Sequence, residues 1–256
     1  HFPLPVGDVG EARQGSLADL PPGWDCFPPF RRPDPAMPDL PFTCLHRPAN
    51  PAVRHPWLLV LMHGVGSNEH DLFGLAPQIP EHFHVLSLRA PYRMGPGAFA
   101  WFDFSIEPDG ERTIDEAQEA HSRALLEQAV PSAARQLGVE PGRTVVGGFS
   151  QGGIMALSLL LTRPGLMHAG LVWHGRLLAQ AVPHIAPADA FHGKHLWVSH
   201  GTHDNVIPLA HAQAIRRQVQ ALPLHLRYEE FAGAHEIRQA ELAHTVAWLQ
   251  GLSGAA

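Results

Sequence analysis

The sequence predicts an α/β fold in which helices cover both faces of a mainly parallel β-sheet. Short apolar runs alternate with longer segments that read as helices, a pattern typical of parallel sheets. One run, Trp57–Met62, is apolar throughout, as a strand buried on both faces requires. The chain has 256 residues, which is enough for a single domain with one sizeable core.

The elements of this fold can be assigned in order from Trp57 onward. Strands are expected at residues 57–62, 84–88, 144–146, 169–173, 195–199 and 224–231. Helices are expected at residues 113–137, from 154 onward, at 209–222 and at 236–249. The first of these helices opens on a capping box, Thr113 to Glu116, and Gly138 ends it.

The beginning of the chain differs from the rest because its prolines follow one another closely, and proline blocks helix interiors. The same segment carries large aromatic residues. We therefore expect residues 1–55 to form a Pro-rich arm packed on a domain of residues 56–256. The arm contains both cysteines, Cys26 and Cys44. They form either one disulfide or two thiols, and two thiols are favoured.

Charge and hydropathy limit the partners of the chain. The net charge of −6, without a basic cluster, argues against nucleic acid. No apolar run approaches the roughly 20 residues that span a bilayer. We expect a cytoplasmic protein. Because the sequence begins with His1 rather than Met, a removed signal peptide is the alternative. A monomer and a homodimer both remain open.

The 19 histidines raise the question of a metal site. His192 with His195 and His200 with His203 form His-x-x-His pairs, but neither pair lies on a helix with a following glutamate base. No set of cysteines and histidines completes the four ligands typical of zinc. The sequence therefore predicts no metal and no other cofactor.

The most informative motif is Gly148-Phe149-Ser150-Gln151-Gly152, which lies between a predicted strand and a predicted helix. A serine at such a junction stands on a sharp, strained turn with its hydroxyl above the sheet. The flanking glycines suit the close approach of strand and helix. Taken alone, the motif is equally compatible with a tight turn of no chemical function.

Two later residues give the serine a chemical context. Asp204 follows the predicted strand that ends at Ser199, and His235 follows the strand that ends at Phe231. Ligands of parallel sheets bind beyond the carboxyl ends of the strands, so Ser150, Asp204 and His235 should meet there. Serine needs a base, and the base needs a carboxylate to fix its tautomer. A loop aspartate or histidine alone is usually a turn residue, but the three together predict a catalytic triad.

Acyl transfer also needs donors for an oxyanion. One expected donor is the backbone N–H of Gln151, directly after the serine. The other is expected from the glycine-rich loop of residues 62–72, where Val65 is the candidate. The side chain of His63 is expected to support this loop rather than to take part in chemistry.

These motifs together resemble the phospholipase/carboxylesterase family of α/β-hydrolases over roughly residues 57–250. The resemblance rests on residues 61–66 and 68–72, Trp101-Phe102-Asp103, residues 148–153, 200–208 and 233–237. It implies an α/β-hydrolase fold, with residues 56–256 as the catalytic domain, and hydrolysis of esters or thioesters without a cofactor. It also implies that Val65 and Gln151 supply the oxyanion donors and that Trp101 lies near the acyl site.

The sequence departs from the family pattern in two places that matter. The Pro-rich arm is longer than a minimal member needs and could cover part of the pocket. Trp173-His174-Gly175 stands where the family commonly has Leu-Ser-Gly. His174 therefore either brings a second imidazole into the substrate pocket, together with Trp101, or is a tolerated loop residue.

The predicted function is that of a serine hydrolase which cleaves carboxylic esters or thioesters of small to medium acyl chains through an acyl-enzyme intermediate. The partner is then a small-molecule ester. Alternatives are a lysophospholipase or a peptidase with the same triad, a non-catalytic binding protein of the same fold, and a metal-dependent hydrolase built on the histidines. Acyl length and leaving group stay open, because spacing does not reveal the shape of a pocket.

Overall fold

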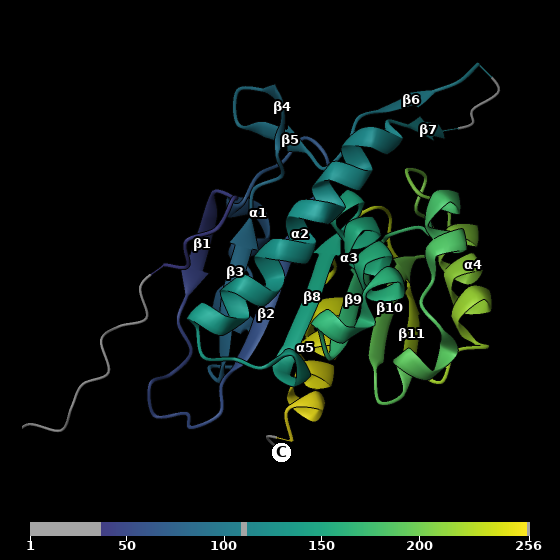
Figure 1. The fold of residues 1–256 in the computed structure, drawn as a ribbon. Coiled ribbons are helices and arrows are strands. Elements are labelled where there is room, and N and C mark those ends of the chain that lie inside the picture. The colour runs from purple at the N-terminus through teal and green to yellow at the C-terminus, as the bar shows by residue number, and fades with distance from the viewer. Residues whose placement is uncertain (1–36, 109–111, 255–256) are drawn as a thin grey trace, which may run out of the picture. The chain divides into compact units, whose positions relative to one another are not determined.

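A seven-stranded β-sheet forms the centre of the protein (Figure 1). The computed structural model describes residues 37–108 and 112–254, which belong to one unit of residues 35–256. In spatial order the strands are β1 (Cys44–Arg47), β3 (Phe83–Leu88), β2 (Trp57–Met62), β8 (Thr144–Phe149), β9 (Ala169–Trp173), β10 (His195–Gly201) and β11 (His225–Phe231). All neighbours are parallel except β1, which runs antiparallel to β3.

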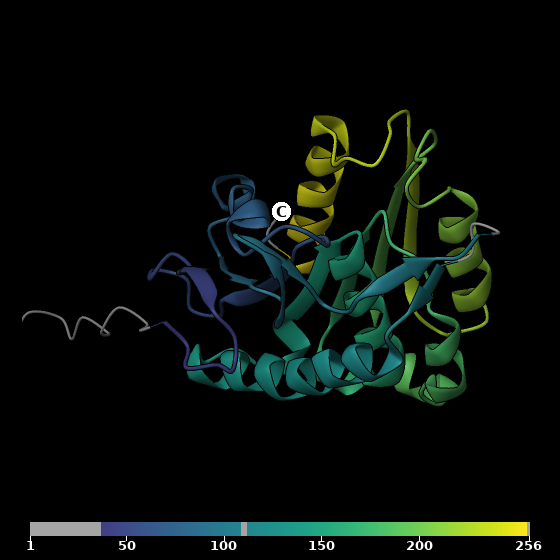
Figure 2. The ribbon, with the colours of Figure 1, turned by 90° about the horizontal axis from the view of Figure 1, so that it is seen from above.

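Helices cover both faces of this sheet, as Figure 2 shows from above. One face carries α2 (Glu116–Gln136), α3 (Gln151–Thr162) and α4 (Ala210–Val219). The other carries α1 (His70–Phe73) and α5 (Gln239–Leu252). The predicted α/β fold is therefore confirmed, and none of the described helices combines the length and apolarity needed to cross a membrane.

Two hairpins and several 3₁₀ turns complete the chain. The hairpins join β4 (Tyr92–Gly95) to β5 (Ala98–Ala100) and β6 (Phe104–Ile106) to β7 (Arg112–Ile114). The 3₁₀ turns are Ala76–Gln78, Pro141–Arg143, Pro164–Leu166, Ala179–His184 and Ala188–Phe191. Both hairpins lie near the upper edge of the sheet in Figure 1, where β8 leads into α3.

Alternation along the strands builds a separate core on each face. In β2 the side chains of Leu58 and Val60 pack with α2 and α3, whereas Leu59 and Leu61 pack with α1 and α5. Successive side chains of a strand point to opposite faces, so a strand with helices on both sides must be apolar at every position. All six residues of β2 are buried.

The predicted strands agree with the observed ones to within three residues at either end, and the largest difference is at the end of β8. The helix expected from Thr113 begins later. Thr113 lies in β7, opposite Ser105, and the cap is Asp115, whose carboxylate accepts the Gln118 N–H at 2.9 Å. Gly138 follows the helix with φ of 68°, a conformation that favours glycine.

The sheet also begins earlier in the chain than the expected boundary between residues 55 and 56. Strand β1 is its edge strand, and Arg47 ties that strand to the chain before β3. The guanidinium of Arg47 donates to the carbonyls of Ala76, Ile79, Pro80 and Phe83 at 2.7–3.1 Å. The expected packing of residues 1–36 lies outside the described residues.

Of the two cysteines, only Cys44 belongs to the described residues. Cys44 lies buried in β1, and burial raises the pKa of its thiol. Cys26 lies outside the described residues, and so does any bond between the two.

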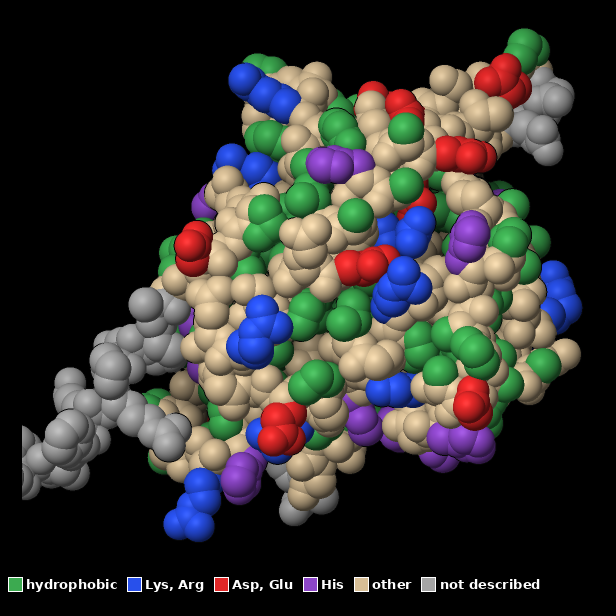
Figure 3. All heavy atoms as spheres, in the orientation of Figure 1, with side chains coloured by type: hydrophobic (Ala, Val, Ile, Leu, Met, Phe, Trp, Pro, Cys, Tyr) green, Lys and Arg blue, Asp and Glu red, His purple; other side chains and the backbone are tan. Residues whose placement is uncertain are grey.

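Part of the histidine content belongs to the amino-terminal edge of the sheet. The rings of His168, His195 and His225 stack across neighbouring strands, with centroids 4.9 and 4.7 Å apart. Burial and the neighbouring imidazoles lower the pKa of His195 to about 4, so the middle ring of this stack is uncharged at neutral pH. Figure 3 shows acidic and basic side chains interspersed over the face that it displays.

The role of Arg47 can be measured. We expect Arg47→Ala to lower the free energy of unfolding by about 2 kcal/mol, because buried carbonyls lose a charged donor. Arg54→Ala, an exposed arginine close by in sequence, is the control. Urea denaturation of both variants tests this, and equal losses would contradict the role given to Arg47.

Candidate active site

Ser150 occupies a strained turn between β8 and α3. Its φ and ψ are 53° and −118°, outside the regions that non-glycine residues normally adopt. The turn requires glycine on both sides, because a Cβ at Gly148 or at Gly152 would collide with the Met62 carbonyl oxygen of β2. The motif thus brings strand and helix close enough together to hold the Ser150 hydroxyl above the sheet.

The structure brings the three predicted triad residues together. Ser150 Oγ lies 2.8 Å from His235 Nε2, and His235 Nδ1 lies 2.7 Å from Asp204 Oδ2. A carboxylate can only accept, so Nδ1 carries the proton and donates to Asp204. Nε2 is then free to accept the Ser150 hydroxyl proton.

Asp204 is held as a carboxylate by its own loop. Its Oδ1 accepts the backbone N–H groups of Val206 at 2.9 Å and Ile207 at 2.8 Å. Burial acts to raise the pKa of Asp204, but the hydrogen bonds from His235, His174 and the Ile207 N–H outweigh it and keep the pKa below 3.8. Asp204 therefore carries a negative charge at any physiological pH.

His235 is held in its neutral form. Burial lowers the pKa of His235 below 6.5, and the hydrogen bond and charge of Asp204 offset this effect only in part. The charges of His174 and Arg112 lower the pKa further. A neutral imidazole is the form that accepts a proton from serine.

His174, for which the sequence left a place in the substrate pocket or a loop role open, lies behind the triad and is not among the residues that line the cavity at Ser150. Its side chain is fully buried, and its backbone has φ of 53°. Nδ1 lies 3.0 Å from Asp204 Oδ2, and Nε2 lies 3.3 Å from Glu241 Oε2. Burial acts to lower the pKa of His174, but the hydrogen bonds and charges of Glu241 and Asp204 outweigh it and raise the pKa above 6.5.

Sequence reasoning missed Glu241, the second carboxylate beside His174. Glu241 belongs to α5 and is fully buried. Its Oε1 accepts the Ser199 hydroxyl at 2.6 Å, and its Oε2 accepts the Arg238 N–H at 3.3 Å. Nothing in the sequence separates this glutamate from one on an exposed helix face, because its burial depends on where α5 packs.

A metal ion could find ligands at one place among the described residues. Nitrogen or oxygen atoms of His174, Asp204 and His235 all lie within 4.8 Å of one another. The same atoms form the hydrogen bonds of the triad and of His174, and a metal would replace them. The expectation of a metal-free site therefore calls for a direct test.

The candidate oxyanion donors lie beside Ser150. Val65 and Gln151 line one cavity with it. The Gln151 side chain fixes the next segment of chain, since its Oε1 accepts the Trp101 N–H and its Nε2 donates to the Phe102 carbonyl, both at 2.6 Å. His63 supports the loop, with Nδ1 2.7 Å from the Gly64 carbonyl and Nε2 accepting the Ala90 N–H at 3.0 Å.

Trp101 also differs from expectation. It is fully buried beneath the loop, where its indole N–H donates to the His63 carbonyl at 3.0 Å. Its neighbour Phe102 lines the cavity instead. Trp101 therefore supports the loop that carries Val65, and Phe102 rather than Trp101 lines the cavity at Ser150.

The cavity at Ser150 measures about 120 Å³ and has mainly apolar walls. Besides Ser150, Val65 and Gln151, its lining comprises Phe102, Phe104, Ile106, Arg112, Ile154, Arg176, Val206 and Ile207. The two arginines are a further feature that sequence reasoning missed. Arg176 follows His174 at the end of β9, so its place at the carboxyl edge could have been inferred from the sequence.

Known proteins share this fold and sequence pattern. The family described as Phospholipase/Carboxylesterase matches residues 47–252. Esterase YpfH of Escherichia coli is 29% identical over 61% of this chain, and the chain spans 66% of that protein. Acyl-protein thioesterase 1 of Cryptococcus neoformans is 28% identical over 66% of this chain and 74% of that protein.

Solved structures agree on the fold. The crystal structure of esterase PE8 has a TM-score of 0.70 and 24% identity, covering 82% of this chain and 99% of its own. The Bacillus cereus carboxylesterase has a TM-score of 0.71 and 20% identity, covering 82% and 94%. With the family match over most of its length, the chain belongs to the phospholipase/carboxylesterase family of α/β-hydrolases.

Proposed function

We propose that the protein hydrolyses carboxylic esters or thioesters through an acyl-enzyme formed on Ser150. The observation that carries the proposal is the unbroken series of hydrogen bonds from Ser150 through His235 to Asp204. Ser150, at the start of this series, lines a mainly apolar cavity. The names of the relatives, which include esterase and acyl-protein thioesterase, support the same class of reaction.

In the first half of the reaction, Ser150 Oγ attacks the substrate carbonyl while His235 Nε2 takes its proton. The oxyanion forms beside Val65 and Gln151, whose N–H groups donate to it. Asp204 stabilises the imidazolium that results, and His235 then protonates the leaving alcohol or thiol. The bond between the substrate carbonyl and its alcohol or thiol has been broken, and an ester bond between that carbonyl and Ser150 Oγ has formed.

In the second half, His235 takes a proton from water, and the hydroxide attacks the acyl-enzyme carbonyl. The oxyanion again forms at Val65 and Gln151. Collapse of the intermediate returns the proton from His235 to Ser150 Oγ and releases the acid. The small volume of the cavity favours small to medium acyl chains over long lipid chains.

His174 acts in this scheme as a positioning residue. It hydrogen-bonds the oxygen of Asp204 that also accepts from His235. As a cation between two buried carboxylates, it compensates the charge that Glu241 adds beneath the triad. Asp204 is therefore fixed from both sides.

Removal of the nucleophile is the first test. We expect Ser150→Ala to lower kcat/KM for 4-nitrophenyl butyrate by at least about a thousandfold, because no acyl-enzyme can form. A fluorophosphonate probe should label the wild type and not this variant. Ser132→Ala, on α2 away from the cavity, should keep full turnover.

Three results would contradict this assignment. They are turnover retained by Ser150→Ala, probe labelling at another residue, and loss of activity on adding a chelator. The last would favour metal-dependent hydrolysis at His174, Asp204 and His235. Steady-state turnover of the simple ester also excludes a non-catalytic binding protein, and assays with a lysophospholipid and a peptide separate the two remaining serine hydrolase alternatives.

The pH profile tests the state of His235. Because its folded pKa is lowered, the imidazole is already neutral below pH 6.5. We expect the acidic limb of kcat/KM for a neutral ester to have its midpoint below 6.5, with full activity at neutral pH. A midpoint above 6.5 would show that His235 is protonated more easily than its surroundings imply.

The charge of His174 can be tested through stability. We expect His174→Leu to cost about 3 kcal/mol or more, since it leaves Glu241 buried without its cation, and Glu241→Leu on that background to recover part of the loss. The pKa of His174 is raised, so its contribution is full below pH 6.5 and is lost as pH rises through the folded pKa.

Urea denaturation at about pH 6 and about pH 9 should therefore give the larger loss for His174→Leu at the lower pH. His244→Leu is the control, because His244 is an exposed partner of Glu229. An equal loss at both pH values would show that His174 is not charged.

A further inference from the structure

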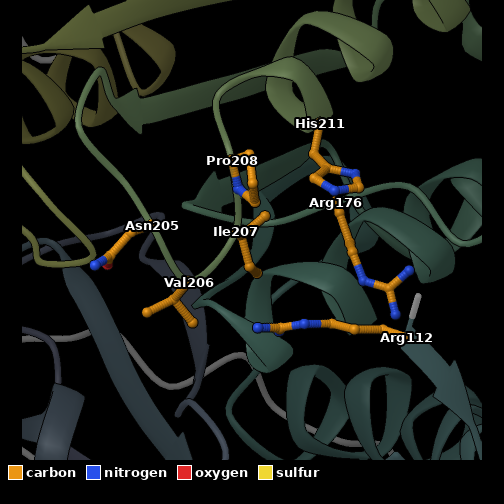
Figure 4. Close-up of a pocket in the computed structure, with 7 residues that line it drawn as sticks. All are labelled: Arg112, Arg176, Asn205, Val206, Ile207, Pro208 and His211. Carbon is orange, nitrogen blue, oxygen red and sulfur yellow. The ribbon is translucent and has the colours of Figure 1, made fainter. Parts of the chain in front are cut away.

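A second, larger cavity opens beside the one that contains Ser150. It measures about 440 Å³ and is drawn in Figure 4. Its lining comprises Arg112, Arg176, Asn205, Val206, Ile207, Pro208 and His211. These residues come from β7, the loop after β9, the loop after β10, and α4. We call it the arginine cavity.

Both arginines line this cavity. In Figure 4, the Arg176 side chain points from the side of His211 toward the stem of Arg112, and the Arg112 guanidinium extends toward Val206. Burial lowers the pKa of Arg176, and the charge of Arg112 lowers it further. Burial and both arginines also lower the pKa of His211, which leaves it a neutral donor. The positive charges are thus close enough to repel one another.

No carboxylate among the described residues forms an ion pair with either arginine. Arg112 lies over the Phe104 ring, 5.5 Å from its centroid, which holds the guanidinium without neutralising it. Two guanidinium groups that line one partly buried cavity favour an anion there, and a carboxylate matches the planar donors of a guanidinium. This cavity has the chemistry of a carboxylate site.

The arginine cavity adjoins the cavity at Ser150. Both are lined by Arg112, Arg176, Val206 and Ile207. The wall between Ser150 and the arginines is apolar, with Phe102, Phe104 and Ile154. A ligand that reaches from Ser150 to the arginines therefore needs an apolar spacer between its reacting carbonyl and its anionic end.

The anion belongs on the acyl side of the ester. His235 protonates the leaving group in the proposed mechanism, so the leaving group departs along the side where His235 lies. A third cavity, of about 290 Å³, lies there and is lined by Asp71, Glu236 and His235 with apolar neighbours. Carboxylates repel an anionic leaving group, whereas both arginines line the cavity at Ser150, which shares no lining residue with this third cavity.

We propose that the substrates are esters or thioesters of dicarboxylic acids, whose free carboxylate binds Arg112 and Arg176 while the esterified carbonyl reacts with Ser150. This inference rests on the proposed function. Water cleaves the ester bond and yields the dicarboxylate and the alcohol or thiol. The free carboxylate takes no part in bond making.

Matched substrates test the proposal. One is a series of 4-nitrophenyl hydrogen esters from adipate to sebacate, and the other is the corresponding methyl 4-nitrophenyl diesters, which differ only in charge. We expect kcat/KM to favour the anionic ester by about tenfold or more at one chain length at least. Arg112→Gln and Arg176→Gln should each remove most of that preference, and Arg54→Gln should leave it intact.

The neutral diester keeps the test independent of folding, because the ratio of kcat/KM for the anionic ester to that for the diester cancels any change in activity that the two substrates share. A preference absent at every chain length, or kept by the Arg112→Gln/Arg176→Gln double variant, would overturn the proposal. If either result were found while Ser150→Ala still abolished hydrolysis of the diester, the dicarboxylate proposal would fail and the proposed function would be retained. Loss of all Ser150-dependent hydrolysis would remove both.

Two further arms fix the geometry. Butyrate esters of 4-hydroxybenzoate and of its methyl ester carry or lack an anion on the leaving group. A preference for the anionic leaving group that depends on the arginines would overturn the acyl-side placement.

Asp109 and Glu111 precede Arg112 and lie outside the described residues. A preference for the dicarboxylate that appears only in Asp109→Asn/Glu111→Gln would overturn the proposal for the native chain.

Discussion

The carboxylate of Asp204 is the group on which the rest of the site depends. It is a buried negative charge, and such a charge is tolerated only when donors surround it. Two backbone N–H groups hold one oxygen, and His235 and His174 share the other. The loop conformation and the tautomer of His235 follow from satisfying this one group, which also contributes, with Glu241, to the raised pKa of His174. Ser150 meets His235 only because that imidazole is already oriented.

Much of the fold and the triad could be predicted because both depend on local patterns and on one general rule. Buried strands are apolar throughout, and carboxyl ends of parallel strands meet at one edge, so Ser150, Asp204 and His235 could be placed together without coordinates. Glu241 could not be placed, since its burial depends on how α5 packs. The edge strand was missed because it lies within the proline-rich part of the chain, where composition argues against regular structure.

The pocket was harder to predict than the triad for a geometric reason. Trp101 and Phe102 are neighbours in the chain, and only Phe102 lines the cavity at Ser150, while Trp101 is buried beneath the loop. A motif identifies the segment that approaches a site, but it does not give the direction of each side chain. The same holds for His174, which points beneath Asp204, while Arg176, two residues later, lines the cavities.

The positive φ of 53° occurs at both Ser150 and His174, the residues that follow two adjacent strands. The Ser150 N–H donates to the Trp173 carbonyl, and the His174 N–H donates to the Ser199 carbonyl, each at 2.9 Å. The two turns are thus repeats of one backbone form, linked through the ends of three neighbouring strands. The Ser150 side chain lines a cavity, whereas the His174 side chain is buried against Asp204 and Glu241. Because the Ser150 N–H is bonded to Trp173, the residue directly before His174, a shift of the turn at His174 would also move Ser150.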